Sequence, residues 1–186
     1  MTAAARMPTR SRTVALSCSV RSSPTAVEDE SLDLADRVAG LLVLLFAQTV
    51  TRVAGLRVAA ISLVDGEIAV NLGQHPVTLP EPVARVFSRY LARRINIGTT
   101  NTETDFLFPG GRPGQHVTAF QLTKHMNAIG ITKADRQGAL TYLVTEAPAA
   151  VVAKATGYSL ATTAARSVLF GPDWVRYAAL KSSASR

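Results

Sequence analysis

The stretch FLFPGGRPGQHVTAFQLTKHMNAIGI, residues 106–131, decides the fold because it holds three local signals in a fixed order. Its first three residues are apolar and precede Pro109-Gly110-Gly111, which predicts a short strand ended by a turn. Thr118 and Gln121 form a capping-box pattern, so a helix is expected to begin there, and Gly130 ends it. The stretch therefore predicts a strand, a turn and a helix.

Upstream of this stretch, the pattern changes between helical and strand periods. An apolar pattern of helical period follows Ser31 and runs to Phe46, with acids in its first turns. Asp65-Gly66 is a hairpin turn signal between two apolar segments. Pro80 and Pro82 open an amphipathic helix. The full upstream series is a helix from Ser31 to Phe46, a short helix over 51–56, strands over 58–64, 67–72 and 77–79, a helix after Pro80, and a polar loop over 95–105.

Downstream, the sequence predicts four short helices, over 134–146, 148–156, 160–169 and 174–182, with Gly157 ending the second. The fold class is mainly α with a small antiparallel β-hairpin or sheet. Residues 1–27 contain four arginines, no acid and many Ser and Thr, which predicts a disordered basic arm. Residues 28–186 then form one helical domain.

Charge is distributed unevenly along the chain. Residues 28–111 carry 7 basic and 10 acidic side chains, a net charge of −3, whereas residues 112–186 carry 9 basic and 3 acidic ones, a net charge of +6. Lys and Arg gain affinity for a polyanion by releasing counterions from its phosphates. The C-terminal half is therefore expected to bind a polyanion, although basic surfaces also serve solubility alone.

Several classes of protein do not fit the composition. Cys18 is the only cysteine, so an intramolecular disulfide is impossible and a reducing cytoplasm is the expected location. His75, His116 and His125 are far apart in sequence with no cysteine nearby, so neither a metal site nor a cofactor is expected. The longest apolar run, residues 39–47, is too short to span a membrane.

Four stretches, in this order, resemble the catalytic domain of the tyrosine recombinases, the phage-integrase family. They are LLVLLFAQTVTRVAGL, VTLPEPVARVFSRYL, the stretch 106–131 quoted above, and DRQGALTYLVTEAPAAVVAKATGYSLATT. The resemblance covers roughly residues 31–180. It implies a recombinase-like catalytic core in which a tyrosine attacks a DNA phosphate, arginines neutralise the phosphate, and other groups move protons.

The resemblance assigns the phosphate-binding positions as follows. Arg52 lies near the first arginine of the family, and other alignments put Thr49 or Arg57 there. The second motif, usually His-x-x-Arg, is Lys133 to Arg136, so its arginine is kept and its histidine is not. No lysine occurs in the hairpin segment 67–79, where the family has one. No stretch of the sequence resembles the family's N-terminal clamp domain either, so that domain is not expected.

The proton-transfer and nucleophile positions depart further from the family. Tyr158 takes the place of a His or Trp, and a phenol with an ordinary pKa of about 10 is a poor proton mover at neutral pH. Arg166 stands where the nucleophile is expected, and a guanidinium cannot attack a phosphate. Tyr177 is the only later tyrosine. It is either the nucleophile or, with Trp174, a residue that packs the last helix onto the domain.

The leading hypothesis is a DNA-binding protein with a recombinase-like domain that does not cleave DNA. Arg112, Lys124, Lys133, Arg136 and Arg166 are the expected contacts to double-stranded DNA, mainly to its phosphates. One alternative is an active recombinase that uses Tyr177. Another is a helix-turn-helix regulator formed by residues 147–169, with Thr162, Thr163 and Arg166 facing a groove. A remnant that keeps only its core is also consistent with the sequence.

Overall fold

The computed structural model of the chain describes residues 29–64, 66–96, 105–112 and 114–170. This part is mostly helical with one small antiparallel sheet, so the predicted fold class is confirmed. The predicted helix 174–182 lies outside the described residues. The elements are α2 (Leu34–Phe46), α3 (Val50–Ala54), the 3₁₀ turn η1 (Val58–Ala60), β1 (Ile61–Val64), β2 (Glu67–Val70), β3 (Val77–Thr78), α4 (Glu81–Asn96), α5 (Ala119–Ala128), α6 (Lys133–Glu146), α7 (Ala149–Thr156) and α8 (Leu160–Phe170).

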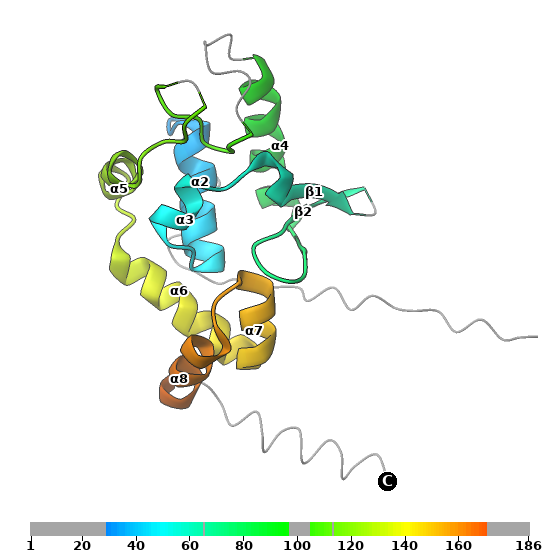
Figure 1. Ribbon diagram of the computed structural model, residues 1–186, viewed down its shortest axis with the longest axis vertical. Coiled ribbons are helices and arrows are strands. Elements are labelled where there is room, and N and C mark those ends of the chain that lie inside the picture. Colours follow the sequence, from blue (N-terminus) through cyan, green and yellow to red (C-terminus); the bar gives the residue numbers. More distant parts are fainter. Residues whose placement is uncertain (1–28, 65, 97–104, 113, 171–186) are drawn as a thin grey trace, which may run out of the picture.

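Helix α2 runs through the middle of the molecule, with α4 on one side of it and α5 on the other (Figure 1). The Asp33 carboxylate caps its first turn by accepting a hydrogen bond of 2.8 Å from the backbone N–H of Ala35. Residues 38–44 and Phe46 are buried, as an apolar run in a central helix requires, and Arg37 is buried in the turn before them. The helix ends at Ala47, whose φ of 55° is left-handed. The chain reverses there and begins α3.

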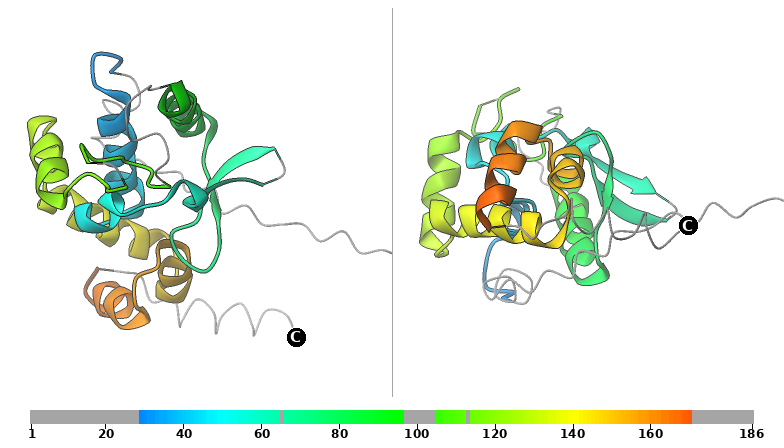
Figure 2. Two further views of the ribbon diagram at one scale, coloured as in Figure 1. Left: turned by 45° about the horizontal axis from the view of Figure 1, so that its top comes forward. Right: turned by 90° about the horizontal axis from the view of Figure 1, so that it is seen from below.

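The predicted hairpin forms as a three-stranded sheet in the order β1-β2-β3. β1 pairs with β2 from Ile61↔Val70 to Val64↔Glu67. Gly66 in the turn has a φ of +82°, which explains the Asp-Gly signal. The sheet lies beside α4 and projects away from the helices (Figure 2). Its inner residues Ala69 and Val70 are buried.

The strand predicted at Phe106–Phe108 is wrong. Within the described residues, this part of the chain makes only isolated bridges, Arg57↔Phe106 at the first residue of the segment and Pro109↔His116 directly after its last. Leu107 and Phe108 are buried, and the Leu107 carbonyl accepts a hydrogen bond of 2.7 Å from the Tyr90 hydroxyl of α4. The backbone pairs briefly on both sides, since the Leu107 N–H donates to the Leu56 carbonyl and the Phe108 carbonyl accepts from the Val117 N–H. Burial raises the pKa of the Tyr90 hydroxyl above its ordinary value.

Helix α5 begins at the predicted capping box. The Gln121 backbone N–H donates to the Thr118 hydroxyl at 3.2 Å, and the Gln121 side chain accepts from the Thr118 backbone N–H at 3.4 Å. Gly130 follows the helix with a φ of +79°, as its position predicts. Met126 and Leu122 are buried against the core, and the opposite face of α5 is exposed.

Two clusters of buried apolar residues hold the domain together. The first is formed mainly by α2, α3, α4, α5 and the sheet. The second is smaller and consists of Ala47 with residues of α6 and α7, which are Ala139, Leu140, Leu143, Val144 and Val152. Helices α6, α7 and α8 pack together at one end of the molecule (Figures 1 and 2). The end of α2 lies where the two clusters meet.

Candidate functional site

Arg52 lies on α3 and reaches across to α7. Its Nη1 donates to the Thr156 carbonyl at 2.9 Å, and its Nη2 donates to the Leu72 carbonyl. Thr156 is the last residue of α7, whereas Leu72 follows β2. Helix α3 is placed by Thr49, whose hydroxyl accepts a hydrogen bond from the Arg52 backbone N–H at 3.3 Å. The guanidinium therefore joins two segments that are far apart in the sequence.

Arg136 approaches the same turn from α6. Its Nη1 donates to the Tyr158 hydroxyl at 2.9 Å, and that hydroxyl donates to the Ala47 carbonyl at 2.6 Å. Because Thr156 and Tyr158 are two residues apart, both arginines are held by one turn between α7 and α8. We refer to Gln48, Arg52, Arg136, Thr156 and Tyr158 together as the arginine cluster.

Gln48 completes the cluster from inside the protein. It is 1% exposed, and its Nε2 donates to the carbonyls of Phe46 and Thr156, both at 3.0 Å. Its Oε1 has no partner among the described residues. The amide thus satisfies carbonyls at the C-terminal ends of both α2 and α7, which have no partner within their own helices.

The turn itself depends on glycine. Gly157 has a φ of +72°, and a Cβ there would lie 2.2 Å from the Leu72 carbonyl oxygen and against the Arg52 guanidinium. Gly73 is equally restricted, because its Cβ would lie 2.0 Å from the Lys154 carbonyl oxygen. The Gln74 N–H donates to that carbonyl at 2.7 Å. The loop after β2 is therefore packed directly on the end of α7.

The two helix ends at the cluster favour positively charged side chains. The C-terminal ends of α2 and α7 meet here, and each carries a partial negative charge from its last carbonyls. Arg52 and Arg136 place positive charge at these ends, which stabilises the helices. An arginine has five N–H donors. The side-chain hydrogen bonds just described use two donors of Arg52 and one of Arg136, so the cluster also has donors with which to bind an anion.

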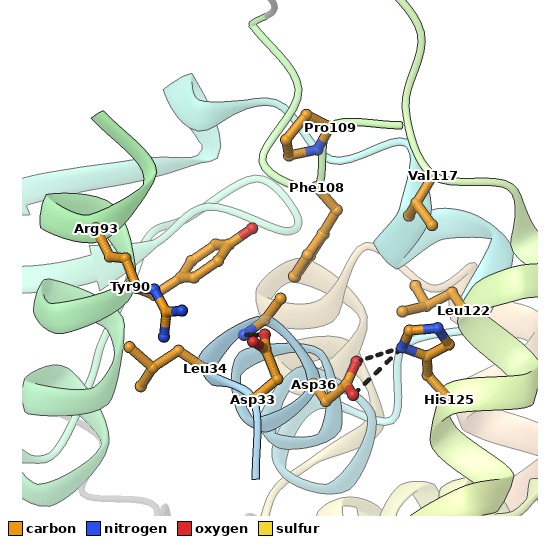
Figure 3. Close-up of a pocket in the computed structure, with 11 residues that line it drawn as sticks. Asp33, Leu34, Asp36, Tyr90, Arg93, Phe108, Pro109, Val117, Leu122 and His125 are labelled. Atoms are coloured by element: carbon orange, nitrogen blue, oxygen red, sulfur yellow. Dashed lines mark hydrogen bonds and ion pairs between the residues drawn. The ribbon is translucent and has the colours of Figure 1, made fainter. Parts of the chain in front are cut away.

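A cavity of about 440 Å³ lies at the other end of α2, between α4 and α5 (Figure 3). Tyr90 and Phe108 form part of its apolar wall. The Asp36 carboxylate and the His125 Nδ1 lie 3.0 Å apart on its rim, within hydrogen-bond distance, and Asp33 lies beside them. Helix α2 has 13 residues and is about 20 Å long at 1.5 Å per residue, so this cavity is well separated from the arginine cluster. Asp33 and Asp36 line it together with Arg93, so it lacks the paired guanidinium groups of the arginine cluster.

Comparison with solved structures shows which proteins have a similar fold. XerA recombinase matches with a TM-score of 0.57 and 20% identity over 80% of this chain and 59% of its own. The fold resembles that of the tyrosine recombinases. XerH site-specific recombinase bound to its difH substrate before cleavage matches with a TM-score of 0.57 and 17% identity, over 78% of this chain and 47% of its own. XerH in a post-cleavage complex with palindromic difH substrate matches with a TM-score of 0.57 and 16% identity, over 85% of this chain and 50% of its own.

The present chain thus spans about half to three-fifths of the length of these recombinases. No protein-family profile matches the sequence, and no curated protein matches it either. Across the described residues, no group of three His, Cys, Asp or Glu side chains is placed to hold a metal ion. None of the helices in the described ranges is long and apolar enough to cross a membrane.

Within this recombinase-like fold, three of the predicted site residues come together, and the other predicted residues in the described ranges do not join them. Arg52, Arg136 and Tyr158 form the arginine cluster with Gln48 and Thr156. Lys133 is exposed on the first turn of α6, on the same helix face as Arg136. Lys124 is exposed on α5. Tyr177 lies outside the described residues.

The remaining predicted residues have contacts of other kinds. Arg112 is exposed in the loop before α5, and its carbonyl accepts a hydrogen bond from the Gln115 N–H. Arg166 lies over the ring of Phe170, with 5.5 Å from its Cζ to the ring centroid. Thr163 is 0% exposed and bonds to the Leu160 carbonyl, so it does not face a groove as the helix-turn-helix hypothesis expected. Sequence reasoning missed Gln48, whose partner Thr156 is 108 residues away.

Proposed function

We propose that this protein binds double-stranded DNA through its recombinase-like fold and does not cleave it. The observation that carries the proposal is that Arg52 and Arg136, although 84 positions apart by their numbering, meet at one turn of this fold. Two guanidinium groups at one place suit the binding of a phosphate. The XerH structures, which contain difH substrate, support DNA as the ligand class.

The exposed face of α5 supports a wider contact area. Thr123, Lys124 and Asn127 are all exposed. Asn127 lies four residues after Thr123 and three after Lys124, so it shares one face of the helix with both. Amide, hydroxyl and ammonium groups are the usual side-chain contacts to phosphate and sugar. Helix α5 packs against α3, which carries Arg52. A DNA backbone bound at the arginine cluster thus has a second basic surface within the same domain.

Two features support the lack of cleavage. Tyr158 is engaged with Ala47 and Arg136, and Arg166 is engaged with Phe170. Cleavage requires a nucleophile, stabilisation of charge on the phosphate and a proton donor for the leaving hydroxyl. The described residues offer only the second of these groups in an arrangement that suits the reaction.

The binding proposal is tested by fluorescence anisotropy with a labelled DNA duplex at several salt concentrations. We expect weak binding with little sequence preference and an affinity that falls steeply as salt rises, because phosphate contacts release counterions. Replacing Lys124 and Lys133 with Ala should weaken binding and lower the slope of log K against log salt by about one per lost phosphate contact.

The matched control is Arg85→Ala, which removes one exposed positive charge from α4, where Arg85 pairs with Glu81. It should leave the affinity nearly unchanged. Absence of binding at low salt would contradict the proposal, as would an affinity that does not depend on salt. If the control and the Lys124 and Lys133 variants lose equal DNA affinity for each charge removed, binding depends on total charge and not on these positions.

A further inference from the structure

Tyr158 occupies a position between the end of α2 and the guanidinium of Arg136. A phenol has a single O–H to donate. Tyr158 donates it to the Ala47 carbonyl at 2.6 Å, so the phenol oxygen can only accept from Arg136, at 2.9 Å. The direction of both hydrogen bonds is therefore fixed. The ring packs against the smaller apolar cluster, which holds the hydroxyl in place.

We propose that Tyr158 is a positioning residue that holds the Arg136 guanidinium ready to bind a DNA phosphate. This inference rests on the proposed function, since it assigns a role within the same DNA-binding site. It also differs from the role that the family resemblance implies at this position, which is proton transfer. Tyr158 acts through Arg136 and need not contact the DNA itself.

Tyr158 can increase DNA affinity in this way because the arginine side chain is long and has many rotamers. Arg136 is half-buried on the first turn of α6, and a long side chain loses much rotamer freedom when it is fixed by a ligand. The hydrogen bond to an anchored phenol removes part of that freedom before the ligand arrives. Such preorganisation increases affinity without adding a contact. Arg52 is held in the same manner by two carbonyls.

The test is to measure duplex affinity and salt dependence for Tyr158→Phe, Arg136→Gln and the double variant, each well below its melting temperature. Tyr158→Phe should bind roughly 3- to 10-fold more weakly, which corresponds to the cost of ordering one long side chain. The double variant should bind no more weakly than Arg136→Gln alone, because Tyr158 acts only through that arginine. The control is Tyr142→Phe, which removes a phenolic hydroxyl from α6, outside the arginine cluster, and should keep the affinity of the wild type.

Each outcome decides the inference. If the wild type binds and Tyr158→Phe has a lower melting temperature but the same affinity and salt slope, Tyr158 is only structural and the inference is wrong. Losses that add in the double variant would also overturn it, because Tyr158 would then act independently of Arg136. If Tyr158→Phe does not fold, Tyr158→His keeps a donor and an acceptor on its ring and should retain more affinity than Arg136→Gln. Failure of the wild type to bind at all would refute the proposed function, and this inference with it.

Discussion

At the scale of single residues, Gly157 controls the arginine cluster most directly. It has a left-handed φ, and it allows Leu72 and Arg52 to approach the turn. We expect Gly157→Ala to lower the free energy of unfolding by at least about 2 kcal/mol, because it adds both left-handed strain and a clash with a backbone oxygen. Thermal or urea denaturation measures this change.

Gly138 provides the matched control for that substitution. It lies inside α6, and an added Cβ would meet no atom within 4 Å apart from its chain neighbours and the nearby backbone of the same helix. Since alanine is a better helix former than glycine, Gly138→Ala should raise the free energy of unfolding by up to about 1 kcal/mol. A Gly157→Ala protein as stable as the wild type would show that the turn can move to admit a side chain, and that glycine is not required at this position.

Single residues also show how far sequence reasoning reaches. Arg52, Arg136 and Tyr158 were predicted as site residues, and the structure places all three in one cluster. Gln48 and the Ala47 carbonyl were not predicted. Their contacts join side chains to backbone oxygens more than a hundred residues away, and such contacts follow no spacing rule. The sequence indicates which groups carry charge, but not which carbonyl each will meet.

At the scale of elements, local signals predicted helices better than strands. The capping box at Thr118 is confirmed because both partners lie within one turn of helix. The strand predicted at residues 106–108 is wrong because a strand needs a partner supplied by the rest of the fold. There, each neighbouring segment offers only a single bridge. A strand is therefore not determined by its own residues alone.

At the start of α6, the hydrogen bonds of Asp135 predict how the stability of the protein changes at low pH. Asp135 accepts hydrogen bonds from the Thr132 hydroxyl at 2.7 Å and from the Thr132 N–H at 2.8 Å, and these lower the pKa of its carboxyl group. A lowered folded-state pKa contributes stability above the unfolded value of about 4, and this is lost as the pH falls through the folded value. Asp135→Ala should therefore cost about 1 kcal/mol or less near pH 6, with a smaller difference from wild type below about pH 3.

Urea denaturation at a series of pH values checks this prediction. Glu146→Ala is the control, because this exposed acid lies at the last turn of α6, where a negative charge does not favour the helix. Its removal should leave stability unchanged or slightly higher. A difference between Asp135→Ala and wild type that stays constant from pH 6 to about pH 2 would contradict the assignment to the carboxylate charge.

At the scale of the whole molecule, cleavage is a property of several groups acting together. Nucleophile, charge stabilisation and proton transfer multiply rather than replace one another. With Lys133, Tyr158 and Arg166 at three positions where the family resemblance implies other chemistry, we expect no covalent protein–DNA complex on a nicked substrate designed to trap one. Denaturing gel electrophoresis of wild type and Tyr177→Phe checks this. An adduct that forms with wild type and disappears in Tyr177→Phe would establish an active recombinase.

The meeting of the two apolar clusters has a consequence for cooperativity. Arg52 and Leu72 belong to segments packed in the larger cluster, whereas Thr156 and Tyr158 adjoin the smaller one, so the hydrogen bonds between them cross the boundary. Any ligand that contacts Arg52 and Arg136 at once therefore spans both clusters. Local opening of α6, α7 and α8 would release that ligand, so its binding free energy adds to the free energy of opening. Hydrogen exchange in these helices is therefore expected to slow as the ligand fills the site.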